Sequence, residues 1–354
     1  MKEIISDQFN LQEWDLRKKT IRSFIAKKTG IDFSKTAEAI NCIETNVTDM
    51  GSYFVKNVYW QTLHNYYVAG NIYLPKEIDD KIPAVMMPHG HFKNDRFYDD
   101  NNQLAPALAK LGCMAVTYDM VGKGEDTETP HDNKYNNALQ LHNSIRILDY
   151  ISTLEYIDKE RIAVTGASGG GTQTMMLSAI DSRINVSIPV CMLSVHFHGG
   201  CLCEMGMNYF EGKSFETTTA EIAAMFAPKD MLVISIGTDW TKNTPNVEFP
   251  YLQKIYGLYN AEGRVKNAHF KKEEHNYGPS KRAAAIQFLS DLFKLDLNKY
   301  NESENILLPI EALKSYSNKY PKPADALTKP KAIYEQMLEY YSNQYSTANS
   351  EVNK

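Results

Sequence analysis

The sequence predicts an α/β protein with a mostly parallel central sheet and helices on both faces. Three observations carry this prediction. The 354-residue chain is 43% hydrophobic with a formal net charge of -5, which is typical of a globular enzyme. Short apolar segments of the kind that form strands buried on both faces recur along the chain. Polar segments that contain glycine follow several of them, where an α/β sheet places its functional residues.

The chain is expected to have three parts. Residues 1–45 mix apolar side chains with many charges and predict an N-terminal helical extension. Residues 46–297 are the expected α/β domain, and its first strands are antiparallel. Residues 298–354 predict a C-terminal helical tail with a tyrosine-rich helix near residues 332–345. The last residues, 346–354, are polar and are expected to be disordered.

The core elements follow from the apolar segments in chain order. Strands of the parallel sheet are expected at residues 83–88, 113–119, 162–164, 186–190, 231–237 and 265–270. Helices are expected at residues 171–180 and 281–295. Because parallel strands share one carboxyl edge, the loops after these strands are expected to meet there.

The segment after residues 162–164 has the pattern Gly-x-Ser-x-Gly, with Ser168 at its centre. Gly166 and Gly170 let the chain turn sharply and hold Ser168 in a strained backbone conformation. The following helix directs its N-terminal amides and positive dipole end at the same point. We expect Ser168 to be a nucleophile and the backbone amide of Gly169 to stabilise an oxyanion.

An acid and a histidine follow this serine in the order that the hydrolase pattern requires. Asp239 comes directly after the strand at residues 231–237 and is the first candidate for the acid. His275 lies in the loop after residues 265–270 and is the expected general base. Glu204 is the second candidate for the acid; a substrate contact and a structural carboxylate are its other two interpretations.

The loop after residues 83–88 predicts a second oxyanion donor, from the backbone amides of Gly90 and His91. His89 and His91 lack the spacing of a helical zinc motif, so no metal is predicted there. A metal hypothesis has more weight for a second run, which contains His196, His198, Cys201, Cys203 and Glu204. The favoured interpretation of this run is a pocket wall, and a redox role for the two cysteines is a further alternative. The sequence therefore predicts no metal and no cofactor.

Residues 83–293 resemble the bacterial α/β-hydrolases of the acetyl xylan esterase-like family, which have glucuronoyl-esterase relatives. The resemblance is carried by PHGH at 88–91, GASGGGTQT at 166–174, GGCLCE at 199–204, TAEIA at 219–223, GTDWTKNTP at 237–245 and HNY at 275–277. It implies the α/β-hydrolase fold, a triad of Ser168, Asp239 and His275, and hydrolysis of a carboxylic ester on a decorated carbohydrate.

Substrate contacts are expected from side chains of the same loops. His89, Glu204, Trp240 and Lys242 are the candidates. Trp240 would either stack on a sugar ring or pack beside the catalytic loop. Arg96, Lys123 and Lys242 would either meet the carboxylate of a uronic acid or be solvated surface charges.

The expected function is a serine esterase acting on an acetyl or uronoyl ester of a carbohydrate. Two alternatives stay open: a peptidase or amidase of the prolyl-oligopeptidase type without its propeller, and a non-catalytic binding protein. Scattered basic residues predict no nucleic-acid partner, and no apolar run predicts a membrane span. No signal peptide is visible at the start of the chain, so a cytoplasmic protein is expected unless a leader has been removed. The sequence does not predict an oligomeric state.

Overall fold

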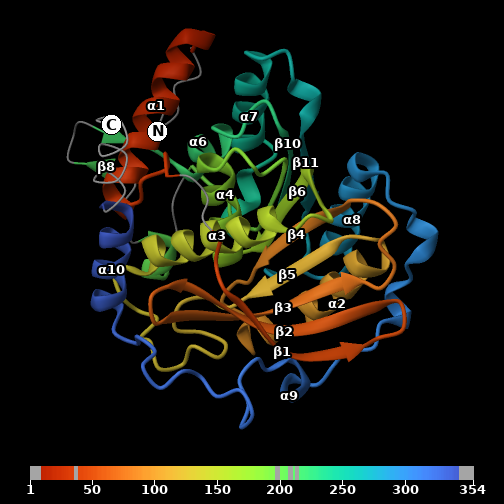
Figure 1. Ribbon diagram of the computed structural model, residues 1–354. Helices are drawn as coiled ribbons and strands as arrows, with labels where there is room; N and C mark the ends of the chain where they lie inside the picture. Colours follow the sequence, from red (N-terminus) through yellow and green to blue (C-terminus); the bar gives the residue numbers. More distant parts are fainter. Residues whose placement is uncertain (1–8, 36–38, 196–199, 206–209, 212–214, 343–354) are drawn as a thin grey trace, which may run out of the picture.

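The computed structural model describes residues 9–35, 39–195, 200–205, 210–211 and 215–342, and its described part is built around one twisted sheet (Figure 1). Nine strands form this sheet in the order β1-β2-β3-β5-β4-β6-β7-β10-β11. Strands β1, β2, β3 and β5 pair antiparallel with their neighbours in that order. The strands β5, β4, β6, β7, β10 and β11 are parallel to one another. Their bounds are β1 Cys42–Asp49, β2 Tyr53–Leu63, β3 Tyr66–Pro75, β4 Ile82–Pro88, β5 Met114–Tyr118, β6 Ile157–Ala167, β7 Val186–Val190, β10 Asp230–Ile236 and β11 Val265–Phe270. A separate short ribbon pairs β8 (Phe210–Glu211) with β9 (Phe215–Glu216).

Helices cover both faces of the sheet and enclose two apolar cores. One core is closed by α1 (Leu11–Thr29), α3 (Asn136–Thr153), α4 (Gly169–Ile180), α6 (Thr219–Ala224), α7 (Glu248–Gly257) and α10 (Pro330–Ser342). The other core is closed by α2 (Asp99–Lys110) and α8 (Pro279–Phe293). Two shorter helices are α5 (Leu202–Met205) and α9 (Ile310–Leu313). The predicted fold class, a mostly parallel sheet with helices on both faces, is confirmed.

Helix α1 is defined by local signals at both ends. Asn10 and Glu13 form a capping box, in which each side chain bonds the other residue's backbone N–H. Gly30 ends the helix with a φ of 75°, a left-handed conformation that suits glycine. Trp14 and Phe24, both buried, anchor the helix on the core. β1 begins at Cys42, inside the segment expected to be a helical extension, because residues 42–49 pair antiparallel with β2, with one irregularity between Glu44 and Asn46.

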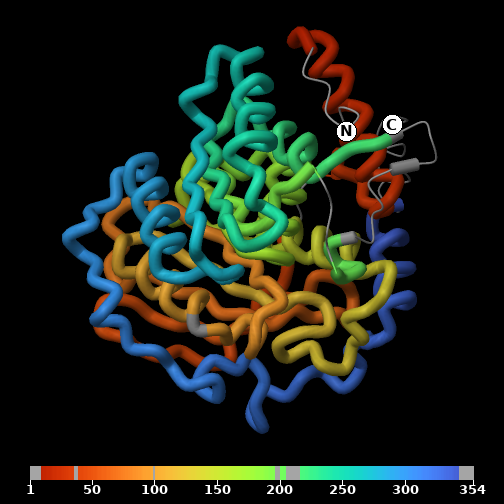
Figure 2. The backbone as a smooth tube through the Cα atoms, turned by 180° about the vertical axis from the view of Figure 1, so that it is seen from behind, coloured from red at the N-terminus to blue at the C-terminus, as the bar shows by residue number. Residues whose placement is uncertain are grey.

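The C-terminal segment is part of the packed body of the protein. Asn71 on β3 donates a side-chain hydrogen bond of 2.9 Å to the carbonyl of Leu313, whose own side chain is buried. Asn57 on β2 donates likewise to the carbonyl of Ala312 at 2.9 Å. The segment then runs along the β1–β3 side of the molecule and ends in α10 against α3 (Figures 1 and 2). The expected helix near residues 332–345 corresponds to α10, and the predicted disorder at residues 346–354 lies outside the described residues.

The six parallel strands place their carboxyl ends along one edge of the sheet. The loops that leave this edge carry His89, Asp119, Ser168, Cys191, Asp239 and His275. Segments far apart in the sequence therefore meet where a site would form. Among the described helices, none combines the length and the apolar character needed to cross a lipid bilayer.

Candidate active site

Ser168 sits at a tight turn between β6 and α4. Its backbone has a φ of 57° and a ψ of -121°, a conformation that costs free energy for a residue with a side chain. A Cβ atom added at Gly166 would lie 2.3 Å from the carbonyl oxygen of Pro88, and one added at Gly170 would lie 2.2 Å from the same oxygen. Only glycine fits at either position, so the two glycines allow the turn that presents Ser168. The Ser168 N–H donates to the carbonyl of Val190 at 3.0 Å and holds the turn against β7.

His275 and Asp239 form a hydrogen-bonded pair at the same edge. The distance between His275 Nδ1 and Asp239 Oδ2 is 2.6 Å. The other carboxylate oxygen, Oδ1, accepts from both the backbone N–H and the hydroxyl of Thr241, each at 2.6 Å. Asp239 is therefore held in one orientation and fixes the tautomer of His275 with a proton on Nδ1. Asp239 thus caps the short helical segment Trp240–Asn243 through Oδ1 and contacts His275 through Oδ2.

Aromatic side chains enclose the imidazole of His275. The ring of Trp240 lies 4.7 Å from it and the ring of Phe92 lies 6.1 Å from it, measured between centroids. Phe92 also reaches Gly90, where an added Cβ would lie 2.7 Å from Phe92 Cε2 and 3.1 Å from Ser168 Cβ. Phe92 therefore packs both against Gly90, next to Ser168, and against the ring of His275.

The expected oxyanion donors lie around the same turn. Gly169 is the first residue of α4, so its amide is at the positive end of the helix dipole. An added Cβ on Gly169 would lie 2.9 Å from Cε1 of His91, which shows that the loop after β4 packs directly on this turn. Gly90 also approaches Ser168, since an added Cβ would lie 3.1 Å from Ser168 Cβ. The backbones of Gly90 and Gly169 and the imidazole of His91 therefore meet at the serine turn.

His89 and Arg96 lie beneath the site. His89 is 1% exposed, and its ring nitrogens contact the carbonyl of Gly90 at 2.8 Å and the N–H of Met120 at 3.0 Å. Burial lowers the pKa of His89 to about 4, so the ring is neutral. Arg96 is also 1% exposed and pairs with Asp119 at 2.7 Å. Arg96 cannot meet a substrate from this position, because its guanidinium is already used inside the fold.

Three further candidates stand on the loops of the active edge. Trp240 is half-buried beside His275, and Lys242 is exposed on the same short helical segment, Trp240–Asn243. Glu204 is buried on α5, and burial raises the pKa of its carboxyl above the ordinary value. The charges of nearby histidines, with that of His91 the largest, act on this carboxyl in the opposite direction.

A cluster of two histidines and two cysteines lies next to the serine turn, and its members are His91, His131, Cys201 and Cys203. The sequence drew attention to the two cysteines but not to His131, which stands alone in the long loop after β5 without any ligand-like spacing. His196 and His198, which the sequence grouped with the cysteines, lie outside the described residues. A hydrogen bond with Cys203, followed by contacts with both imidazoles, lowers the pKa of the Cys201 thiol to about 2. All five cysteines of the chain are in the described part, and none forms a disulfide.

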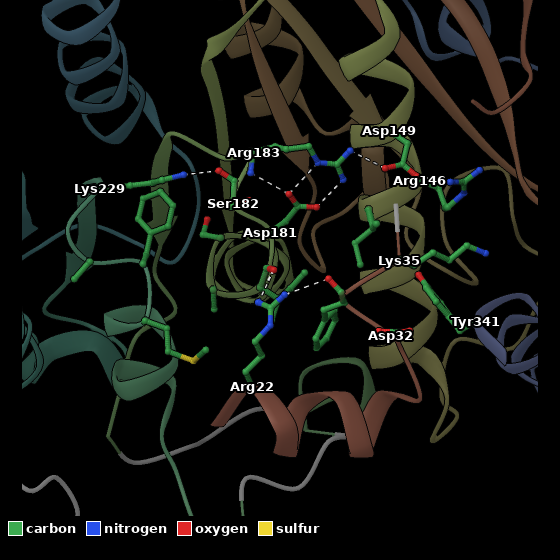
Figure 3. A pocket seen from close by; sticks show the side chains of 18 of the residues that line it. Arg22, Asp32, Lys35, Arg146, Asp149, Asp181, Ser182, Arg183, Lys229 and Tyr341 are labelled. Carbon is green, nitrogen blue, oxygen red and sulfur yellow. Dashed lines mark hydrogen bonds and ion pairs between the residues drawn. The ribbon is translucent and has the colours of Figure 1, made fainter. Parts of the chain in front are cut away.

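The described residues also line a cleft away from this edge, with a volume of about 620 Å³ (Figure 3). It lies at the far end of α4, and this 12-residue helix separates it from Ser168 by about 18 Å. The charged side chains in it already have partners: Arg183, for example, pairs with Asp149 at 2.7 Å and with Asp181 at 2.6 Å. Such mutual pairing favours a structural role for these groups.

Comparison with known proteins defines the class to which this fold and site belong. The sequence profile of the acetyl xylan esterase family matches residues 34–199. Methylesterase BT1017 is 34% identical, and the aligned region covers 97% of this chain and 78% of that one with a TM-score of 0.85. The chain therefore belongs to the acetyl xylan esterase-like family of α/β-hydrolases, a family of carboxylic-ester hydrolases.

Other known proteins are similar to this chain in fold or in part of the sequence. A glucuronoyl esterase from Solibacter usitatus is 12% identical with a TM-score of 0.60, and the alignment covers 80% of this chain and 93% of that one. A curated relative from Pseudomonas aeruginosa, PA2218, is 27% identical over 128 residues, which cover 35% of this chain and 33% of that protein. The match thus spans about a third of the length of PA2218.

Proposed function

We propose that the protein is a serine esterase that hydrolyses a carboxylic ester on a carbohydrate through an acyl-enzyme intermediate. The observation that carries the proposal is the 2.6 Å bond between His275 Nδ1 and Asp239 Oδ2, at the edge where Ser168 occupies a strained turn. In a serine hydrolase, this pair activates the hydroxyl that attacks the ester carbonyl.

Each residue has a defined step. His275 Nε2 takes the proton of Ser168 as the serine oxygen attacks the carbonyl carbon, and Asp239 stabilises the resulting imidazolium. The negative charge that develops on the carbonyl oxygen is stabilised by backbone amides, with Gly169 as the first donor and Gly90 or His91 as the second. His275 then gives its proton to the leaving alcohol. Water then takes the place of the alcohol. His275 removes its proton as it attacks the acyl-enzyme, and then returns that proton to the departing Ser168 oxygen.

We further propose that the ester is the methyl ester of a sugar acid. The 34% identity to a methylesterase over 97% of this chain supports this choice, because that name specifies an ester whose alcohol is methanol. The acyl group would then be a uronoyl group. The exposed Lys242, beside Trp240, would approach the polar groups of such a substrate while the indole packs on a ring face.

The test compares two substrates and three proteins. Hydrolysis of a methyl glucuronate ester and of an O-acetylated xyloside, both of which have unactivated alcohols as leaving groups, is measured for wild type, Ser168→Ala and the control Ser152→Ala, which removes a hydroxyl at the end of α3. We expect Ser168→Ala to lose turnover by a factor on the order of 10⁴ to 10⁶, and Ser152→Ala to retain it. A strong preference for the acetylated xyloside would show that the substrate is an acetyl ester and not a methyl ester. Equal rates in wild type and Ser168→Ala would refute the serine mechanism, and the absence of turnover on both esters by folded wild type would contradict the proposed substrates.

A further inference from the structure

Four side chains from three loops bring their ligand-type atoms to one point beside the serine turn. His91 follows β4, His131 lies in the loop after β5, and Cys201 and Cys203 lie at the start of α5 in the segment after β7. The distances are 2.9 Å between His91 Nε2 and His131 Nε2, 3.1 Å between Cys201 Sγ and His131 Nε2, and 3.2 Å between Cys203 Sγ and His91 Nε2. All four atoms lie within 4.8 Å of one another.

We propose that His91, His131, Cys201 and Cys203 bind a zinc ion as a tetrahedral Cys₂His₂ site. Zinc–sulfur bonds of about 2.3 Å and zinc–nitrogen bonds of about 2.0–2.1 Å require neighbouring ligand atoms to be roughly 3.3–3.8 Å apart. The observed distances are a few tenths of an ångström shorter, so each side chain needs only a small outward movement to receive the ion. Two thiolates and two imidazoles are a ligand set that zinc prefers.

The surroundings of His131 support the proposal. Its Nδ1 lies 2.6 Å from the carbonyl oxygen of Val121, which can only accept a hydrogen bond. His131 therefore carries a proton on Nδ1 and donates it there, so Nε2, which faces the other three ligand atoms, is the nitrogen available to bind a metal. Metal-binding histidines are oriented in this way by a hydrogen bond from the second ring nitrogen.

The cysteines have a matching arrangement. Cys203 is buried, and its backbone N–H donates to Cys201 Sγ at 3.4 Å, an interaction that favours a thiolate. A Cys201–Cys203 disulfide is the main competing explanation for two neighbouring thiols. A disulfide would use only the sulfur atoms, however, and would leave unexplained why two imidazole nitrogens converge on the same point.

The position of the site indicates a structural metal. Four protein ligands complete a tetrahedral shell, so no coordination position remains for water or substrate. The ion would join the loops that follow β4, β5 and β7. His91 packs on Gly169, next to Ser168, as the 2.9 Å approach of an added Cβ to His91 Cε1 shows. The zinc would therefore hold the loop after β4 against the serine turn.

Metal content of the full-length protein tests the proposal independently of the esterase activity. The proteins are purified without chelators or metal-affinity resin, incubated with zinc, desalted, and analysed by mass spectrometry of the elements. We expect about one zinc ion per chain for wild type and for the control Cys42→Ser, whose half-buried thiol lies on β1 outside the cluster. Cys203→Ser and His131→Gln should retain almost none.

A second measurement on wild type covers the case in which these variants do not fold. Cobalt replaces zinc, and the spectrum should show thiolate-to-cobalt charge transfer together with the intense visible bands of tetrahedral coordination. Wild-type protein that takes up no zinc would overturn the proposal, as would equal zinc content in wild type and folded Cys203→Ser. A Cys201–Cys203 disulfide found in the native protein by peptide mass analysis would overturn it as well.

Discussion

His142 is expected to make the protein sensitive to acid. It is fully buried on α3, where its Nε2 lies 3.2 Å from the carbonyl oxygen of Thr62 and its Nδ1 lies 3.0 Å from the hydroxyl of Tyr341 on α10. The carbonyl can only accept, so the neutral ring donates from Nε2 and accepts from Tyr341 at Nδ1. The rings of Tyr340 and Tyr341 pack edge-on against the imidazole. A second proton, on Nδ1, would force the Tyr341 hydroxyl to turn its own proton away from the ring and accept instead.

The size of the effect follows from the pKa of this group. Burial, and then the positive charges of Arg146 and Lys35, lower the pKa of His142 from 6.5 to about 3. The folded state therefore binds fewer protons than the unfolded state between these values, so stability is complete above pH 6.5 and is lost as the pH falls towards 3. The linkage relation gives a loss of about 2 kcal/mol between pH 7 and pH 5 from this residue alone.

Urea unfolding at pH 7 and pH 5 measures the effect for wild type and His142→Gln, which keeps a donor for Thr62. Every other titrating group is common to the two proteins. The difference between their free energies of unfolding should therefore shrink by about 2 kcal/mol at the lower pH. Tyr341→Phe removes only the hydroxyl hydrogen bond and should cost about 1 kcal/mol at pH 7. Parallel losses of stability in wild type and His142→Gln would refute the reasoning.

Three more substitutions test other features. Asp239→Asn should lower kcat on the preferred ester by roughly 10³ to 10⁴, because an amide favours the wrong tautomer of His275, and a loss below tenfold would contradict its role. Gly90→Ala places a methyl group 2.4 Å from the carbonyl oxygen of Ala167. The free energy of unfolding in urea should therefore fall by about 1–3 kcal/mol, and turnover should fall with it. Wild-type stability and turnover in this variant would contradict the expectation. Arg96→Leu leaves buried carboxylates without their cation and should cost about 3–5 kcal/mol in thermal unfolding, whereas an unchanged melting temperature would show that they are paired otherwise.

Local patterns were sufficient for the parallel sheet and for the turn that carries Ser168. Most of the parallel strands contain a short apolar segment that is buried on both faces, so composition marks them, whereas β11 at the edge of the sheet is only partly buried. The turn has a short sequence signature because Gly166 and Gly170 must both avoid the carbonyl of Pro88, a requirement set within a few residues. Asp239 and His275 follow from the chain order of strands, and the structure brings their side chains together at 2.6 Å.

Contacts between distant segments were not visible in this way. His131 contacts Cys201 across 70 positions, and neither has a neighbour that would reveal the pairing. Arg96 stands on a loop, as a substrate-binding cation would, yet it is buried, because its partners Asp119 and Glu125 come from the loop after β5. These contacts depend on which loops meet at the same edge of the sheet. The local pattern of apolar and polar residues does not contain this information.

The hydrogen bond from Asn71 to Leu313 has a consequence for how the protein is made. The two residues are 242 positions apart, so at 5–20 residues per second the ribosome adds Leu313 about 12–50 s after Asn71. During that interval the antiparallel strands β2 and β3 exist without the segment that satisfies their buried asparagines. The first strands to be synthesised are thus among the last to be completed, and a nascent chain is expected to depend on chaperones for this period.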